Sequence, residues 1–72
     1  MPVYTLVIAG ADGHQHTTLS DFPNDKAAIG DTGQFVSTEH PSVAIARGAG
    51  GDVEFMGAWD WNDGDPSWTP DN

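Results

Sequence analysis

The sequence predicts a small α+β domain, a four-stranded antiparallel sheet with one helix packed on one face, in the order β-β-α-β-β. Three observations predict this fold. Four runs of β-branched and aromatic residues have the length and alternation typical of strands. Asp-Gly or glycine-rich segments join these runs in pairs, as in hairpins. A segment with a helix start signal separates the two pairs, so we expect the helix between them.

The first pair of strands is predicted around an Asp-Gly turn. Residues 3–9 combine valine, isoleucine, threonine and tyrosine, which favour an extended backbone. Asp12 and Gly13 supply the turn, and residues 14–19 form the returning strand. On the first strand, Tyr4, Leu6 and Ile8 would share one face, because alternate residues of a strand point to the same side.

The helix is predicted over residues 25–39. Asn24 or Asp25 suits the N-cap, because a short polar side chain accepts a hydrogen bond from the first turn. Gly30 and Gly33 weaken this helix, each by about 1 kcal/mol relative to alanine. Its buried face would carry Ala28, Ile29, Thr32, Phe35 and Val36.

The second pair of strands is predicted over residues 42–47 and 52–61, joined by a glycine-rich loop over residues 48–51. Pro66 and Pro70 would prevent any further strand. We therefore expect a single α+β domain over residues 1–61, followed by an irregular acidic segment over residues 62–72. In the last strand, alternation predicts a core face of Val53, Phe55, Gly57, Trp59 and Trp61, and a solvated face of Glu54, Met56, Ala58 and Asp60.

The charge of the chain predicts what kind of partner it binds. Eleven Asp and Glu residues against two basic ones, Lys26 and Arg47, give a formal net charge of -9 over 72 residues. Residues 48–72 contain no Lys or Arg. Like charges repel, so direct binding to nucleic acid or to an anionic membrane surface is disfavoured. A basic protein surface is the expected partner, although acidity serving solubility alone gives the same composition.

The composition also predicts a cytoplasmic protein. There is no cysteine, which excludes disulfides and thiolate metal sites and fits a reducing compartment. The apolar run at residues 3–9 lacks a basic flank and is too short for a signal peptide or a membrane span.

Metal binding and catalysis have weak support in the sequence. His14 and His16 would point to one side of a strand, and His40 or Asp12 would have to complete a zinc site, which needs three or four ligands. Exposed histidines beside a turn fit this pattern better. Residues 60–65 resemble a calcium loop, but the glycine is out of register. No nucleophile signature is present, so we expect no metal, no cofactor and no enzymatic activity.

The acid distribution gives the candidate partner-binding residues. Alternate strand residues lie about 6.6 Å apart, comparable to the step between phosphates on a nucleic-acid strand. A row of carboxylates at this spacing would fit a basic groove built for DNA or RNA. Trp68 would supply an apolar anchor unless it folds back onto the sheet. The candidate partner-binding residues are therefore Asp52, Glu54, Asp60, Asp63, Asp65 and Trp68.

In its length, its lack of cysteine and the basic-free stretch over residues 48–72, the chain resembles small acidic phage-encoded anti-CRISPR proteins of the DNA-mimic type. The resemblance implies a noncatalytic inhibitor in the host cytoplasm. Its target would be the basic nucleic-acid channel or PAM-reading surface of a CRISPR effector complex. The alternative function is a small protein-interaction module, such as an antitoxin or assembly adaptor, which would bind through its apolar face and tryptophan cluster.

Overall fold

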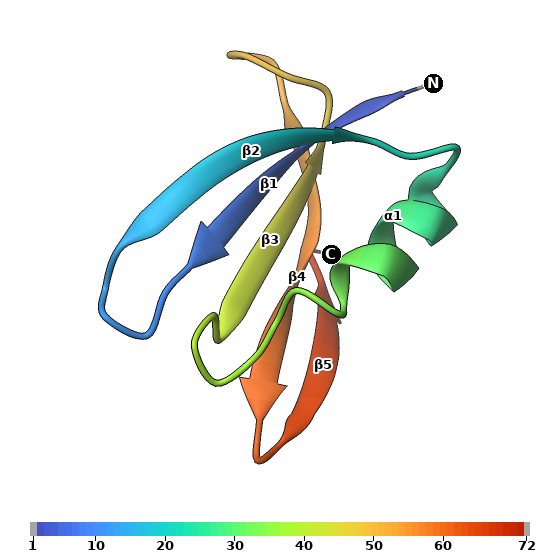
Figure 1. Ribbon diagram of the computed structural model, residues 1–72. Coiled ribbons are helices and arrows are strands. Elements are labelled where there is room, and N and C mark those ends of the chain that lie inside the picture. The colour runs from blue at the N-terminus through green and yellow to red at the C-terminus, as the bar shows by residue number, and fades with distance from the viewer. Residues whose placement is uncertain (1, 72) are drawn as a thin grey trace.

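A computed structural model describes residues 2–71, which form one antiparallel sheet and one short helix (Figure 1). The sheet has five strands in the spatial order β2-β1-β3-β4-β5, so β3 is central and β2 and β5 are the edges. In chain order, the elements are β1 (Val3–Ala9), β2 (Gln15–Asp21), α1 (Asp25–Thr32), β3 (Ser42–Arg47), β4 (Glu54–Asn62) and β5 (Asp65–Pro70).

The predicted four-stranded α+β fold was wrong, because the chain forms a fifth strand and is mostly strand with one short helix. The segment expected to be irregular contains β5, which pairs with β4 along its whole length. Pro66 and Pro70 lie opposite Trp61 and Gly57. Counted from the hairpin turn, these are positions where the backbone nitrogen points away from β4. Proline is tolerated there because β5 is an edge strand.

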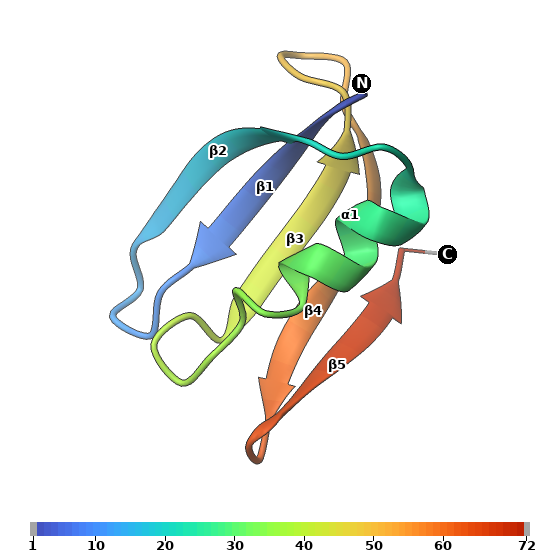
Figure 2. The same cartoon turned by 45° about the vertical axis from the view of Figure 1, so that its right-hand side comes forward.

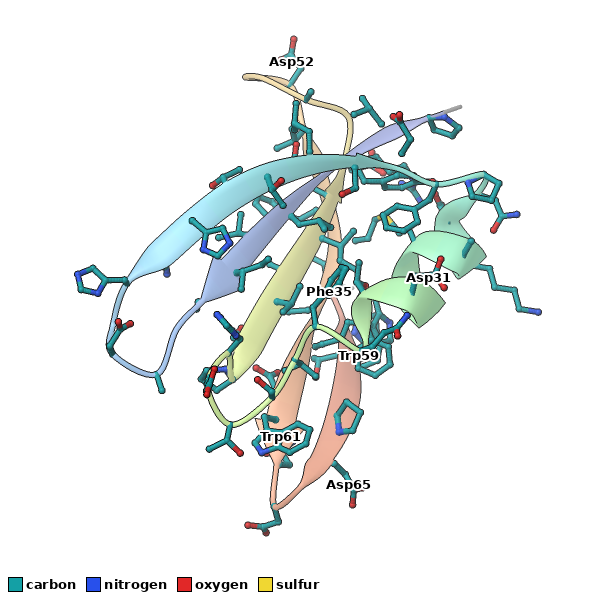
Figure 3. The ribbon with its side chains drawn as sticks, viewed as in Figure 1. Asp31, Phe35, Asp52, Trp59, Trp61 and Asp65 are labelled. Atoms are coloured by element: carbon teal, nitrogen blue, oxygen red, sulfur yellow. The ribbon has the colours of Figure 1, made fainter. Side chains whose placement is uncertain are left out.

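The helix begins where the sequence predicted and ends early. Asn24 is its N-cap, and the Asn24 Oδ1 atom accepts a hydrogen bond from the Ala27 N–H at 2.8 Å. α1 stops at Thr32 rather than residue 39, with Gly33 at the C-cap. Phe35, expected on a buried helix face, therefore lies beyond the helix and is 47% exposed (Figure 3).

The core lies between α1 and the side of the sheet that the helix crosses in Figure 2. The predicted inward face of β1 is confirmed for Tyr4 and Leu6, which are 2% and 1% exposed. Their neighbours include Phe22, whose ring meets that of Tyr4 edge-on at 5.6 Å. The buried cluster comprises Tyr4, Leu6, Phe22, Ala28 and Ile45, with Ile29, Met56, Trp59 and Trp68 packed against it. We call the opposite side of the sheet the open face.

A β-bulge reverses the predicted sides of two β4 residues. The register between β3 and β4 shifts between Ile45 and Ala46, which pair with Gly57 and Phe55 respectively. The extra residue, Met56, packs against the core, although alternation predicted it to be solvated. Phe55, predicted in the core, shares the open face with Ala46 and is 49% exposed. A bulge changes the side on which preceding residues lie, which explains the error.

Candidate functional site

The β4–β5 hairpin presents three of the predicted partner-binding carboxylates: Asp60, Asp63 and Asp65. Its two-residue turn consists of Asp63 and Gly64, whose φ angles are 47° and 90°. Asn62 and Asp65 form the last strand pair before this turn. Positive φ at both central positions is what a type I′ turn requires, and Asp-Gly meets that requirement well. The turn therefore places the exposed carboxylates of Asp63 and Asp65 at the tip of the hairpin.

Asp60 lies on the open face of β4, beside Ser42 of β3 and Ser67 of β5. Its side chain is partly buried, while the two carboxylates at the turn are exposed. Within residues 2–71, neither Lys26 nor Arg47 forms an ion pair with any of the three hairpin carboxylates. The hairpin therefore carries negative charge that no Lys or Arg side chain within the described residues 2–71 neutralises.

The five predicted acids do not form one row. Asp52 lies in the loop before β4, and Glu54 is the first residue of that strand. Asp52 and Asp65 lie at opposite ends of the molecule (Figure 3). Glu54 also accepts a hydrogen bond from the Arg47 guanidinium, which it shares with Asp25. The structure thus groups the three hairpin carboxylates and separates Asp52 and Glu54 from them.

Arg47 joins β3 to the start of α1. Its Nε and Nη2 atoms donate to Asp25 Oδ2 at 2.8 and 2.5 Å. The Tyr4 hydroxyl donates to Asp25 Oδ1 at 2.7 Å. Hydrogen bonds from Arg47, and then from Tyr4, lower the pKa of Asp25 below its ordinary value. The hydrogen bond to Asp25 raises the pKa of Tyr4. This cluster connects the helix to the sheet, so we assign it a role in stability.

A hollow of about 830 Å³ opens beside this cluster. Both basic residues of the chain line it, but Arg47 is already bound to Asp25 and Glu54. The remaining wall offers a ligand mainly apolar contact. Its lining residues are Pro2, Val3, Tyr4, Asn24, Asp25, Lys26, Arg47 and Gly48.

The predicted apolar anchor, Trp68, packs back onto the sheet. Its ring centroid lies 5.5 Å from that of Trp59, at an interplanar angle of 58°. Trp59 is itself held by α1, since its Nε1–H donates to the Ile29 carbonyl oxygen at 2.8 Å. Trp68 belongs to the border of the core, so replacing it would disturb the fold as well as any partner contact.

The three histidines lie near the β1–β2 turn and the loop before β3. His14 Nδ1 is 3.0 Å from Asp12 Oδ2, and the rings of His16 and His40 meet edge-on at 6.5 Å. The backbone N–H of His14 hydrogen-bonds to Asp12 and lowers the pKa of that carboxyl. Within residues 2–71, no three His, Asp or Glu side chains are placed to share a metal ion.

The hydroxyl groups of Thr5 and Thr32 are also committed to structure. Thr5 Oγ1 donates to the Gly48 carbonyl at 2.7 Å, and Thr32 Oγ1 donates to the Ala28 carbonyl at 2.7 Å. Nucleophilic catalysis needs a hydroxyl bonded to a base instead. Neither hydroxyl therefore has the arrangement of an activated nucleophile.

Sequence reasoning missed two features of the surface. The turn at Asp63 and Gly64 carries the same Asp-Gly signal that predicted the first hairpin, so attention to that dipeptide would have found β5. The position of Phe55 on the open face had no such signal, because the bulge arises from the pairing of β3 with β4. The open face therefore becomes visible only in the structure.

No protein-family model, curated protein or solved structure matches the chain. No helix within residues 2–71 has the length and apolar character needed to cross a bilayer.

Proposed function

We propose that this protein is a noncatalytic inhibitor that imitates nucleic-acid charge and binds a basic nucleic-acid-binding protein. The observation that supports the proposal is the group of carboxylates on the β4–β5 hairpin, Asp60, Asp63 and Asp65, which no basic side chain within residues 2–71 balances. A partner with Lys and Arg residues in a groove would supply the missing charge. Complementary charge also steers encounter and raises the association rate.

The target we propose is a CRISPR effector complex. Such complexes hold nucleic acid in positively charged channels and read the PAM through arginine side chains. A narrow hairpin with carboxylates at its tip has a suitable shape and charge to enter a groove of this kind. The proposal places the protein in the cytoplasm of a bacterial host, where these complexes act, and assigns it no direct nucleic-acid ligand.

A displacement assay tests the proposal. Fluorescent target DNA bound to a purified, guide-loaded CRISPR effector is titrated with the protein and followed by anisotropy. We expect displacement by the wild-type chain and its loss in the triple variant Asp60→Lys, Asp63→Lys and Asp65→Lys. These side chains lie at a turn or next to serines. Lysine is less suited than aspartate to the positive φ of position 63, so circular dichroism verifies that the triple variant is folded.

The matched control is a triple variant with the same change of net charge elsewhere: Asp21→Lys, Asp31→Lys and Glu39→Lys. All three acids are exposed and lie outside the hairpin. If the control retains displacement, the hairpin carries the activity. If both variants lose it equally, net charge alone accounts for binding. No displacement by the wild-type chain from any effector tested would reject the CRISPR target.

The second candidate is a small interaction module, such as an antitoxin or assembly adaptor. It is favoured by the exposure of two large apolar side chains on the open face, Leu19 at 55% and Phe55 at 49%. Single exposed apolar residues are common, but a pair on one unpartnered face fits a docking surface. Binding of such a module would be insensitive to salt, whereas binding of a charge mimic weakens as salt is added.

A further inference from the structure

The open face has an apolar centre. One row of cross-strand neighbours runs over four strands of this face. Leu19 pairs with Thr5, Thr5 with Ala46, and Ala46 with Phe55. Thr5 and Ala46 are 8% and 0% exposed, although α1 lies on the other side of the sheet. The two larger side chains at the ends of the row are about half exposed. They flank Thr5 and Ala46, which are covered and leave little surface of their own for a partner.

A hollow of about 290 Å³ on the open face is lined on one side by Phe55. Its floor comes from Ala44 and Ala58, which are cross-strand neighbours and leave room because their side chains are single methyl groups. Val7 and Thr69 continue this row on the flanking strands. A side chain from a partner would therefore find an apolar floor here, with an aromatic wall on one side.

Carboxylates border this hollow. Asp60 and Asp71 both line it. The basic residues lie on the other side of the molecule, because Arg47 pairs with Asp25 and Glu54, and Lys26 lies on α1. Within residues 2–71, the open face thus combines an apolar centre with negative charge and has no cation of its own.

We propose that the open face docks an amphipathic, basic helix of the partner protein, with its apolar side chains on Ala44, Phe55 and Ala58 and its Lys or Arg side chains against Asp60 and Asp71. The proposal rests on the proposed function, since the partner is basic. The charge argues against other occupants: a nucleic acid would be repelled, and a second copy of the chain would bring another formal charge of -9. A helix laid on a sheet face is a standard layer packing.

Binding of three synthetic peptides tests this docking mode. The first is a short helical peptide with leucines on one face and lysines on the other. The second has the same composition in a shuffled order, and the third is oligolysine of equal charge. In amide NMR titrations, we expect the amphipathic peptide to bind most tightly. Its largest shifts should fall on residues lining the hollow, such as Ala44, Phe55 and Ala58.

Two variants and one control locate the contact. Phe55→Ala removes the aromatic wall, and Ala58→Glu fills the floor while keeping the face anionic. Each should weaken the amphipathic peptide about tenfold, equivalent to about 1.4 kcal/mol. Phe35→Ala is the matched control, because Phe35 is equally exposed but lies in the loop after α1 (Figure 3). It should leave the affinity unchanged. Amide spectra of the free variants verify that each is folded.

The outcomes separate this inference from the proposed function. Equal binding of all three peptides, together with unchanged affinity in Phe55→Ala and Ala58→Glu, would overturn the docking inference and leave the charge mimic intact. Preference for the amphipathic peptide without any salt dependence would support the apolar contact on the open face but contradict both the charge mimic and the pairing of lysines with Asp60 and Asp71. Shifts confined to α1 and the hollow beside Arg47 would also overturn the inference.

Discussion

Replacing Gly33 with alanine should destabilise the protein, whereas the same change at Gly30 should stabilise it. Gly33 has helical backbone angles, φ -59° and ψ -26°, so its conformation accepts an alanine. Space decides the outcome instead. A Cβ atom at position 33 would lie 2.9 Å from Cζ2 of Trp59. At position 30, no heavy atom beyond the two neighbouring residues and the helix's own backbone lies within 4 Å of the added Cβ.

The size of the effect follows from how firmly the Trp59 ring is held. Its Nε1–H donates to the Ile29 carbonyl, and its other side packs against Trp68, so it has little room to retreat. Overpacking of this kind costs about 1–3 kcal/mol. Alanine in place of glycine inside a helix contributes about 1 kcal/mol of stability at Gly30. The two variants should therefore differ by about 2–4 kcal/mol.

Urea unfolding followed by tryptophan fluorescence measures this difference. With a slope of about 1 kcal/mol per molar urea for a small domain, the two midpoints should lie at least about 2 M apart. The Gly33→Ala midpoint should fall below that of the wild-type chain. If both variants share one midpoint, or if Gly33→Ala is the more stable, the contact between α1 and Trp59 is not as the structure has it.

Three further variants test the local interactions. Asn24→Ala should lower stability by about 1 kcal/mol in urea unfolding, because it removes the N-cap hydrogen bond. Asp25→Asn should make the free energy of unfolding depend less on pH in acid. Arg47 lowers the pKa of Asp25, so the ionised carboxylate stabilises the fold above about pH 4, and this contribution is lost as the pH falls further. An equally steep loss of stability at low pH in the wild-type protein and in Asp25→Asn would contradict this. Gly57→Ala should detach β5, because its Cβ would lie 2.5 Å from the Thr69 carbonyl oxygen at a φ of 154°. Unchanged hydrogen-exchange protection of β5 would refute that expectation.

Local signals predicted several elements correctly. β1 and β3 occupy the predicted residues 3–9 and 42–47, since β-branched side chains favour an extended backbone. Asn24 acts as the predicted N-cap because capping depends only on the adjacent turn. These features are determined within a few residues, and for that reason a single sequence is enough to find them.

The errors come from interactions between distant segments. Pro66 and Pro70 were taken to end the sheet, yet an edge strand accepts proline where the nitrogen faces outward, and which strand is the edge depends on the whole topology. The side occupied by Phe55 depends on the bulge opposite Ile45 and Ala46. Alternation along β4 alone has no information about that pairing.

The same distinction applies to the candidate site. Composition identified the acids, and the turn at Asp63 and Gly64 groups the hairpin carboxylates. Pairing between strands decides the rest, because Arg47 lies opposite Glu54 across β3 and β4 and forms an ion pair with it. The ring contact between Trp59 and Trp68 likewise follows from the pairing of β4 with β5. The sequence thus indicated which groups were available, and the sheet register determined which of them remain unpaired.

The salt dependence of direct binding to a guide-loaded CRISPR effector free of target DNA tests the central claim most directly. If the carboxylates of Asp60, Asp63 and Asp65 substitute for phosphates, the logarithm of the affinity should fall steeply and linearly with the logarithm of salt concentration. The slope should shrink when these three residues are changed to Asn. An affinity that stays constant from low to high salt would contradict the claim.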